Sequence, residues 1–269
     1  MPEGNVIHHQ ARRLGRAFMK RVVRVDSPQG RFADGASRVD GRTVTKVEAH
    51  GKHLFIGFDN RLWIHVHLGL FGKWRFRNGD PVEPQGQLRM RIMSDEKYAE
   101  LRGPTVCEVL TSAEKKEAIA RIGPDPIRKD ADPERAWNKV HRSRTAIGAL
   151  LMNQQVFAGV GNIYRAEVLF RHGISPYRPG SRVDREEFDA MWGDLAQLMS
   201  AGTKRARIDT VREEHLPEVM GRAPREDRHG GEVYVYRRAG QSCFLCEAEV
   251  QMADMQGRKL YWCPGCQPD

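Results

Sequence analysis

The sequence contains no apolar run of the roughly 20 residues that a membrane span needs, and its start has no apolar secretory core. Membrane-spanning and secreted proteins are therefore not expected, and we predict a cytoplasmic protein. Repeats of a whole supersecondary unit are also absent, which argues against a solenoid. Cysteine is scarce outside the C-terminus, because only Cys107 precedes residue 243, and its apolar setting TVCEVL predicts a buried thiol.

Acidic residues are nearly missing from residues 135–182, although the whole chain contains 35 of them against 44 basic residues. Glu167 is the only acid in this segment, whose net charge is +7. A basic excess concentrated in one segment is typical of a surface that binds phosphate groups. The eight basic residues are Arg135, Lys139, Arg142, Arg144, Arg165, Arg171, Arg178 and Arg182.

The hydrophobic pattern changes from strand-like to helical along the chain. After a helix predicted over residues 5–20, the pattern of residues 21–110 indicates strands, with a hairpin turn at Asp59 and Asn60. The Pro- and Asp-rich residues 123–134 are interpreted as a linker, in which Asp132 and Pro133 are expected to be the cap and first residue of a helix. Residues 135–201 have a helical period, and the last helix is expected to start at Asp184 and to end at Gly202. Residues 203–230 are expected to form a loop.

The four C-terminal cysteines form two C-x2-C pairs, CFLC and CPGC, with sixteen residues between them. Each pair places two thiolates on one side of a tight turn, and two pairs complete a tetrahedral shell of four sulfurs. We therefore predict one structural Zn²⁺, and a hairpin between the pairs whose tip exposes Arg258. The predicted ligands are Cys243, Cys246, Cys263 and Cys266.

Two glycines, Gly159 and Gly161, bracket a tight connection in the segment GVGNIYRAEVLF, and a helix is expected to begin at Asn162. Glycine lets the backbone approach a ligand closely, and the N–H groups at a helix start attract anions. An ordinary helix cap would give the same pattern. Beside the basic segment and the zinc hairpin, we favour phosphate binding by Asn162.

The chain begins MPEG, which places proline directly behind the initiator methionine. If Met1 is removed, Pro2 becomes a secondary amine, and an N-terminal amine titrates roughly 2 pH units below a lysine. Such an amine can attack an electrophilic carbon and form an iminium adduct. Glu3 would then be the neighbouring carboxylate.

The motifs MPEG, GKHLF, GVGNIYRAEVLF and YWCPGC together resemble the formamidopyrimidine-DNA glycosylase and endonuclease VIII family of base-excision repair enzymes, and most closely its actinobacterial endonuclease VIII branch. The resemblance implies an α+β, multi-domain fold. It predicts an N-terminal β-sandwich domain with an N-terminal helix over residues 1–124 and a linker over 125–134. A helix–two-turn–helix domain is expected over 135–230 and a zinc finger over 231–269.

The resemblance also implies a role for each matching residue. Pro2 matches the nucleophile that attacks C1′ of the damaged nucleotide, Glu3 the carboxylate that moves protons during sugar opening, and Lys52 the lysine near the sugar and phosphate. Asn162 and Arg258 match residues that bind DNA phosphates. Leu70 and Phe71 lie where the branch inserts side chains into the gap left by a flipped base. One departure concerns base excision: no carboxylate follows Glu3 before Asp26, and Asn5 and Val6 stand where the family often has a second glutamate.

These inferences predict a bifunctional DNA glycosylase and abasic-site lyase that excises oxidised bases, pyrimidines in preference. The expected partner is double-stranded DNA with damaged or abasic nucleotides, or single-stranded DNA, and the enzyme is expected to be a monomer that requires no membrane. An enzyme that prefers oxidised purines is the rival within the same fold. A non-catalytic, zinc-dependent binder of damaged, abasic or single-stranded DNA is the alternative from another class.

Overall fold

The computed structural model describes residues 2–84, 86–226 and 231–268. The chain divides into two compact units, residues 1–121 and 122–269, which are described separately below as unit 1 and unit 2. No helix in the described part of the chain is both long enough and apolar enough to cross a lipid bilayer.

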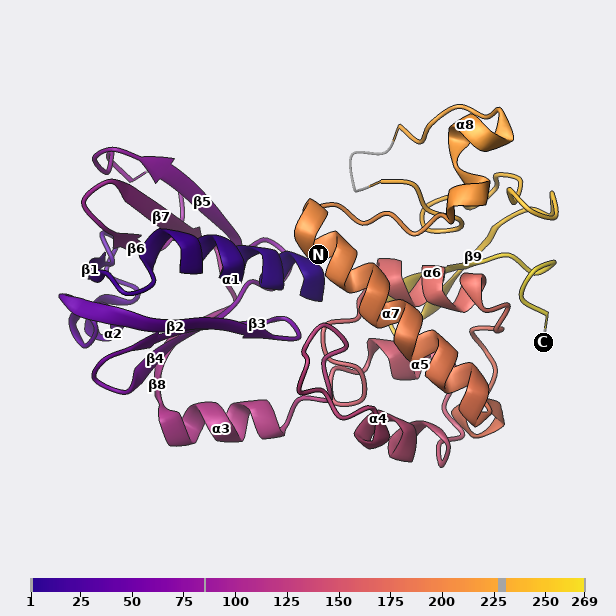
Figure 1. The fold of residues 1–269 in the computed structure, drawn as a ribbon, viewed down its shortest axis with the longest axis horizontal. Coiled ribbons are helices and arrows are strands. Elements are labelled where there is room, and N and C mark those ends of the chain that lie inside the picture. Colours follow the sequence, from indigo (N-terminus) through magenta and orange to yellow (C-terminus); the bar gives the residue numbers. More distant parts are fainter. Residues whose placement is uncertain (1, 85, 227–230, 269) are drawn as a thin grey trace. The chain divides into compact units, whose positions relative to one another are not determined.

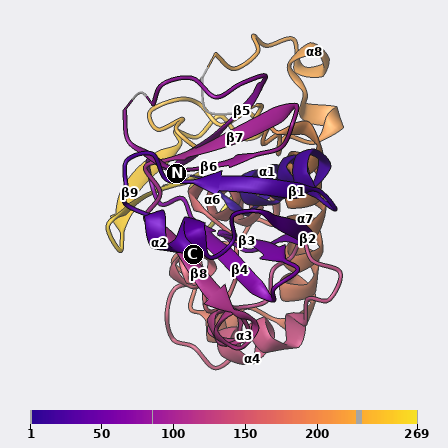
Figure 2. The same ribbon diagram turned by 90° about the vertical axis from the view of Figure 1, so that its left-hand side faces the viewer.

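Unit 1 is built on one antiparallel sheet of eight strands that is folded into two layers (Figures 1 and 2). The strand order is β5-β7-β6-β1-β2-β3-β4-β8, and β1 joins the layers through only two residue pairs with β2. The predicted turn at Asp59 and Asn60 connects β3 to β4. The strands are β1 (Val22–Asp26), β2 (Arg42–His50), β3 (His53–Phe58), β4 (Leu62–His67), β5 (Lys73–Asn78), β6 (Leu88–Met93), β7 (Lys97–Arg102) and β8 (Val106–Thr111).

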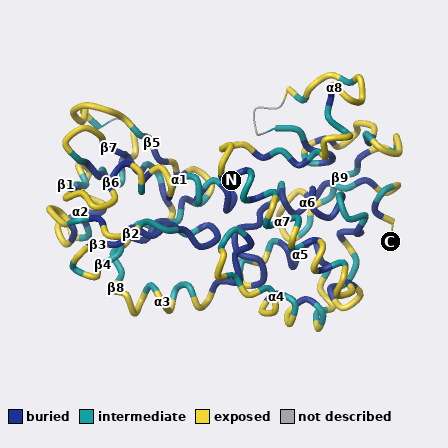
Figure 3. The backbone as a smooth tube through the Cα atoms, viewed as in Figure 1, coloured by how far each residue is buried: buried dark blue, intermediate teal, exposed yellow. Residues whose placement is uncertain are grey.

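Helix α1 (Gly4–Phe18) packs its apolar side into the core between the two layers. The residues predicted to share that side, Ile7, Ala11, Leu14 and Phe18, are all at most 6% exposed. Figure 3 shows buried backbone along this helix and along the central strands. The rest of unit 1 contains α2 (Ala33–Ser37) and α3 (Ser112–Ala120), neither of which was expected from the sequence. The sequence therefore predicted α1 and the strands of unit 1.

Unit 2 is mainly helical, and capping residues account for two of its helix starts. Asp132 caps α4 (Pro133–Val140), and Asp184 forms a capping box with Glu187 at the start of α7 (Arg185–Arg205), as the sequence predicts. The other helices are α5 (Ile147–Met152), α6 (Asn162–Arg171) and α8 (Pro217–Met220), with short 3-10 turns at Gly180–Arg182 and Glu213–His215. The two short elements at residues 213–220 lie where only a loop was expected.

The predicted end of the last helix was wrong. Gly202 is buried inside α7, which continues to Arg205 and ends with Ala206 in the left-handed conformation (φ 56°). The neighbouring Thr203 is buried, and its hydroxyl donates to the Met199 carbonyl at 2.9 Å, so this last turn packs inward. Burial of the turn therefore decides where the helix ends, and the glycine does not.

Part of the segment interpreted as a linker is buried in unit 2. Asp125 is fully buried, its carboxylate accepts the Ile127 N–H at 2.9 Å, and the Gly123 N–H donates to the Gln154 carbonyl at 2.9 Å. The boundary between unit 1 and unit 2 falls after Arg121, whereas the sequence suggested a domain boundary at residue 124. Residues 123–127 therefore contribute to the packing of unit 2.

A two-stranded hairpin of β9 (Gln251–Met255) and β10 (Arg258–Trp262) lies between the two cysteine pairs, as predicted. Glu167 on α6 anchors the segment that leads to this hairpin. Its fully buried carboxylate accepts the Thr210 hydroxyl at 2.6 Å and the backbone N–H groups of residues 234, 235 and 236 at 2.6–2.9 Å. The lone acid of the basic segment therefore holds α6 to the C-terminal part of the chain.

Candidate active site and metal centre

Pro2 and Glu3 lie at the start of α1, where the helix brings them to the surface of unit 1. Pro2 is partly exposed, whereas Glu3 is 3% exposed. Glu3 occupies the cap position, and its carbonyl accepts the Val6 N–H at 3.0 Å, but its side chain makes no capping bond. The buried carboxylate next to Pro2 in the chain therefore takes no part in capping the start of the helix. Met1 lies outside the described residues.

Asn5, in the first turn of α1, occupies the region where the family often has a second glutamate. Its side chain is 1% exposed, and its Oδ1 has no hydrogen-bond partner among the described residues. A buried acceptor without a partner costs about 1–3 kcal/mol. This amide therefore offers an unused acceptor two residues after Glu3.

Lys52 lies in the tight turn between β2 and β3 and is 7% exposed. Gly51 beside it has φ 56°, a conformation that favours glycine, so the GK pair fits a turn that a bulkier first residue would strain. Burial of a lysine stem at a strand end holds its ammonium in a restricted volume. At 7% exposure, Lys52 is not a freely solvated surface lysine.

A chain of hydrogen bonds begins beside Lys52 and crosses three strands. His65 Nδ1 lies 2.8 Å from Glu108 Oε1, and His65 Nε2 lies 2.8 Å from His53 Nδ1. If Glu108 accepts the proton of His65 Nδ1, then neutral His65 accepts from His53, which leaves His53 Nε2 without a proton. The register explains this arrangement, because His65 pairs with Glu108 across β4 and β8 and His53 pairs with His67 across β3 and β4.

Burial and the surrounding histidine rings keep His53 neutral. Burial is the largest cause, followed by the neighbouring rings, and together they lower the pKa of His53 to about 3. Burial also lowers the pKa of His67, with smaller contributions from His65 and Lys52. His53 and His67 are therefore uncharged near a buried lysine at ordinary pH. The sequence indicated only that His65 and His67 share one face of a strand.

Leu70 and Phe71 are held outward by the turn between β4 and β5, with exposures of 52% and 86%. The Gly72 N–H donates to the Leu68 carbonyl at 3.0 Å, and a Cβ at Gly72 would lie 2.3 Å from that oxygen. The turn therefore requires glycine there and directs both apolar side chains into solvent. This exposure is inconsistent with a core role and leaves both side chains available for insertion.

In unit 2, Asn162 is the first residue of α6 and contacts the hairpin. Its Nδ2 donates to the Lys259 carbonyl at 2.7 Å, and Arg165 bonds both Asn162 Oδ1 and the same carbonyl. Arg258, the neighbour of Lys259, is exposed at the start of β10. The structure thus brings together the two residues predicted to bind phosphate, because the Asn162 amide joins the helix start to the hairpin.

The turn before α6 is held by Gln154, which the sequence did not single out. The Gln154 side chain accepts the Gly159 N–H at 3.0 Å and donates to the Val160 carbonyl at 2.9 Å. Gly159 has φ 89°, so the turn also needs the freedom of glycine. The only feature of the sequence that could have indicated this role of Gln154 is a polar residue five positions before the GVG motif.

The four predicted metal ligands converge on one point. Their sulfur atoms lie within 4.8 Å of one another, with Cys243 to Cys266 at 3.8 Å and Cys246 to Cys263 at 3.3 Å. A tetrahedral shell with Zn–S bonds of about 2.3 Å has sulfurs roughly 3.8 Å apart. These four thiols can therefore hold a metal ion. Cys107 lies apart from them in β8, and burial raises the pKa of its thiol to about 12.

The basic segment differs from the expected open phosphate-binding face, because several of its cations bind partners within unit 2. Arg171 forms a two-bond ion pair with Asp194 at 2.6 and 2.8 Å, and Arg178 pairs with Glu187 at 2.6 Å. Arg165 is 1% exposed. Their acidic partners lie beyond residue 182, so the charge count over residues 135–182 did not include them.

The chain is similar to known DNA repair proteins over nearly its whole length. Residues 1–104 match the formamidopyrimidine-DNA glycosylase N-terminal domain, and residues 122–213 match the formamidopyrimidine-DNA glycosylase H2TH domain. Endonuclease 8 1 of Mycobacterium tuberculosis is 48% identical over 99% of this chain and 100% of its own length. Probable endonuclease 8 2 of Streptomyces coelicolor is 31% identical over 99% of this chain and 94% of its own length.

Solved structures share the fold. The Lactococcus lactis Fpg in complex with an abasic site containing DNA superposes with a TM-score of 0.80 at 19% identity, and the match covers 99% of this chain and 100% of that one. At this identity the likeness establishes the fold. It agrees with the expected α+β architecture of a β-rich first unit and a helical second unit.

Proposed function

This chain belongs to the formamidopyrimidine-DNA glycosylase family, and on that basis we propose that it is a bifunctional DNA glycosylase and abasic-site lyase of base excision repair. One observation of the molecule carries the proposal: Pro2 is partly exposed directly beside the buried carboxylate of Glu3, which takes no part in capping α1. A nucleophile next to a positioned carboxylate is the arrangement that covalent catalysis needs.

The proposed reaction starts when Pro2, freed of Met1, attacks C1′ of the damaged nucleotide. The bond between C1′ and the base breaks, the base leaves with its electron pair, and the Glu3 carboxyl moves the protons of sugar opening. The resulting iminium carries C1′ as an electrophile and makes the C2′ protons acidic. Loss of a C2′ proton then expels the 3′ phosphate by β-elimination, which cleaves the strand.

The remaining predicted residues supply binding in this proposal. Lys52 is placed near the sugar and its phosphate, and the exposed Leu70 and Phe71 fill the gap that a flipped base leaves. Flipping costs about a few kcal/mol, which side-chain insertion offsets in part. Asn162 and Arg258 hold phosphates at the α6 start and the hairpin tip.

A zinc ion would be bound by the four converging cysteine thiolates. A segment of this size buries few apolar residues, so metal binding would supply much of its folding free energy. Zinc in such a closed four-sulfur shell is structural and supports the position of Arg258.

We place the enzyme in the bacterial cytoplasm, as a monomer that acts on damaged or abasic double-stranded DNA, with oxidised pyrimidines preferred. The non-catalytic DNA binder stays the alternative, because Asn5 and Val6 stand where a second glutamate is frequent in the family. An oxidised-purine preference is the rival within the fold. Oligonucleotides that each carry one lesion decide between the two substrate preferences.

Borohydride trapping on an abasic duplex tests the catalytic proposal. The processed protein should form a covalent complex, and Pro2→Gly should trap more weakly without losing the complex, since glycine presents a primary amine.

Glu3→Gln should lose base excision more than lyase activity, because an abasic site has already lost its base. A form with a verified, intact Met1 should bind DNA yet trap none, since its Pro2 nitrogen is an amide. Equal trapping by that form would point to a lysine such as Lys52.

A further inference from the structure

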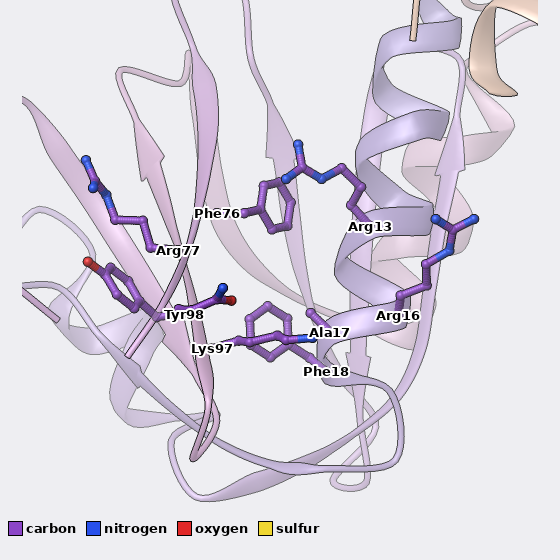
Figure 4. Close-up of a pocket in the computed structure, with 9 residues that line it drawn as sticks. Arg13, Arg16, Ala17, Phe18, Phe76, Arg77, Lys97 and Tyr98 are labelled. Carbon is purple, nitrogen blue, oxygen red and sulfur yellow. The ribbon is translucent and has the colours of Figure 1, made fainter. Parts of the chain in front are cut away.

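A second candidate binding site lies in unit 1, at the C-terminal half of α1. Here α1 and the paired strands β5 and β7 enclose a pocket of about 360 Å³ (Figure 4). Arg13 and Arg16 come from the helix, Arg77 from β5 and Lys97 from β7, and all four side chains are exposed. The lining is completed by Ala17, Phe18, Phe76, Asn78 and Tyr98.

The charge of this pocket is of one sign. None of its nine lining residues is acidic, and within the described part of the chain its four cations form no ion pair with a carboxylate. The neighbouring pocket, which shares Tyr98, shows the usual alternative: Asp26, Asp80 and Asp95 line it, and Asp26 pairs with Arg91 at 2.7 Å. Clustered cations without carboxylates raise the local potential and attract anions.

Ring stacking orders one cation of the pocket, Arg13, and a buried residue forms the base of the pocket. The Arg13 guanidinium lies over the Phe76 ring, 4.0 Å from its centre, and Figure 4 shows Arg13 stacked across the pocket from α1 to β5. A stacked guanidinium keeps its N–H edge free for phosphate oxygens. Phe18 forms the base of the pocket and is well packed, because it is 1% exposed.

Favourable interaction with the helix dipole explains only part of this arrangement. Arg16 is in the last turn of α1, where a cation is stabilised by the helix C-terminus. Arg13 lies nearer the middle of the helix and Lys97 is on a strand, so neither gains from that dipole. Arg77 follows Phe76 in β5 and points to the opposite face of the sheet, as Figure 4 shows. Arg13 and Lys97 therefore need another reason to face one pocket.

The pocket is separate from the proposed catalytic residues. Arg13 and Arg16 follow Pro2 by 11 and 14 residues, which corresponds to roughly 17 and 21 Å along an α-helix. Such a distance spans about five to six base pairs of duplex DNA. A ligand in this pocket therefore does not occupy the position of a nucleotide that Pro2 attacks.

We propose that this pocket is a second, lesion-independent binding site for the phosphodiester backbone of duplex DNA, an inference that rests on the proposed function. The enzyme would hold a damaged nucleotide at Pro2 while the pocket binds another DNA segment. Arginine and lysine side chains that contact only phosphates bind without sequence preference, so the site would serve undamaged DNA.

The test uses the full chain after its catalytic site has been filled. The protein is trapped with borohydride on a short abasic duplex, and the purified complex is then titrated with a labelled, undamaged duplex. Wild-type complex should bind this second duplex, and R13A/R16A/K97A should weaken that binding by tenfold or more. The same triple variant should lower the slope of log affinity against log salt concentration by about three.

Matched variants separate charge at the pocket from charge elsewhere. R31A/R38A/R42A removes three exposed arginines from the same unit and should leave second-duplex binding within twofold of wild type. R13K/R16K, which leaves Lys97 in place, should keep most of the binding if the site recognises phosphate charge. Thermal unfolding verifies that each variant is folded.

The outcomes distinguish this inference from the proposed function. Normal trapping with no second duplex bound, or with equal binding by R13A/R16A/K97A and R31A/R38A/R42A, would overturn the inference and leave the lyase intact. Failure of the wild type to trap would overturn the proposed function. In that case the salt slope of undamaged-duplex binding, compared between the two alanine triples, still decides whether the pocket binds DNA.

Discussion

The cations of the α1–β5 pocket in unit 1 and those of residues 135–182 in unit 2 differ in what surrounds them. In unit 2, Arg171 is bound by Asp194 and Arg178 by Glu187, and Arg165 is buried against a backbone carbonyl. In the unit 1 pocket, Arg13 and Arg16 face no carboxylate and lie in solvent. The same residue type therefore stabilises the fold in one unit and is available to a ligand in the other.

The difference shows why a charge count along the chain is a poor guide to a binding face. Asp194 lies 23 residues from Arg171 in the sequence, outside any window drawn around the basic segment. A charge count along the chain also misses the pocket of unit 1, because the cations that line it come from three separate elements. Only exposure and the identity of the neighbours determine which arginines are available.

Loss of the metal ligands should have the largest effect and should be confined to unit 2. We expect Cys263→Ser to release zinc and unfold the C-terminal hairpin, since a closed four-sulfur site supplies folding free energy. Elemental analysis should give one zinc per wild-type chain and much less in the variant, and DNA affinity should fall. Folded, active protein without stoichiometric zinc would contradict the metal assignment.

Matched arginine substitutions test the comparison directly. Arg171→Ala leaves the nearly buried Asp194 with only His172 and should cost about 3 kcal/mol of stability. Burial opposes ionisation, but hydrogen bonds from His172 and Arg171 lower the pKa of Asp194, so the carboxylate stays charged. Arg16→Ala should lower the melting temperature far less, because it removes only the weak interaction with the C-terminus of α1. Similar melting temperatures for both variants would show that the two environments do not differ as described.

The histidine cluster should make unit 1 sensitive to acid. His53 has a pKa of about 3 when folded, against about 6.5 when unfolded, so the unfolded state binds its proton first as pH falls. Stability should be complete above pH 6.5 and be lost down to about pH 3, by up to about 1.4 kcal/mol per pH unit. Urea unfolding between pH 7 and 4 measures this slope, which His53→Asn should reduce. An unchanged slope would exclude His53 as its source.

Substitutions at the hairpin and the α6 start should have the smallest effect and act mainly on DNA affinity. Arg258→Ala should weaken binding to all DNA sequences equally and reduce the salt slope by about one. Asn162→Ala should also weaken binding, and in addition loosen the hairpin, since the amide bonds the Lys259 carbonyl at 2.7 Å. Unchanged affinity in either variant, with zinc and fold intact, would remove that residue from the phosphate-binding set.

Local features of the chain were predictable because short-range physics decides them. The spacing of apolar residues predicted α1, the Asp184 and Asp132 caps predicted two helix starts, and the cysteine spacing predicted the four converging thiols. In each case the residues that form the feature follow a short, regular spacing in the sequence: successive helical turns, a cap and its helix, or the two C-x2-C pairs. Motif resemblance added the family, which the matches to its N-terminal and H2TH domains confirm.

By itself, the sequence determined the family, the α+β composition and the four cysteines that can hold a metal ion, because these depend on residue type and spacing. Only the tertiary structure decided that Gly202 continues a helix, that Leu70 and Phe71 are exposed, and that His53, His65 and Glu108 form one hydrogen-bonded chain. It also decided which arginines are paired. Each of these features depends on residues brought together across strands and helices, and burial and pairing are properties of that assembled surface.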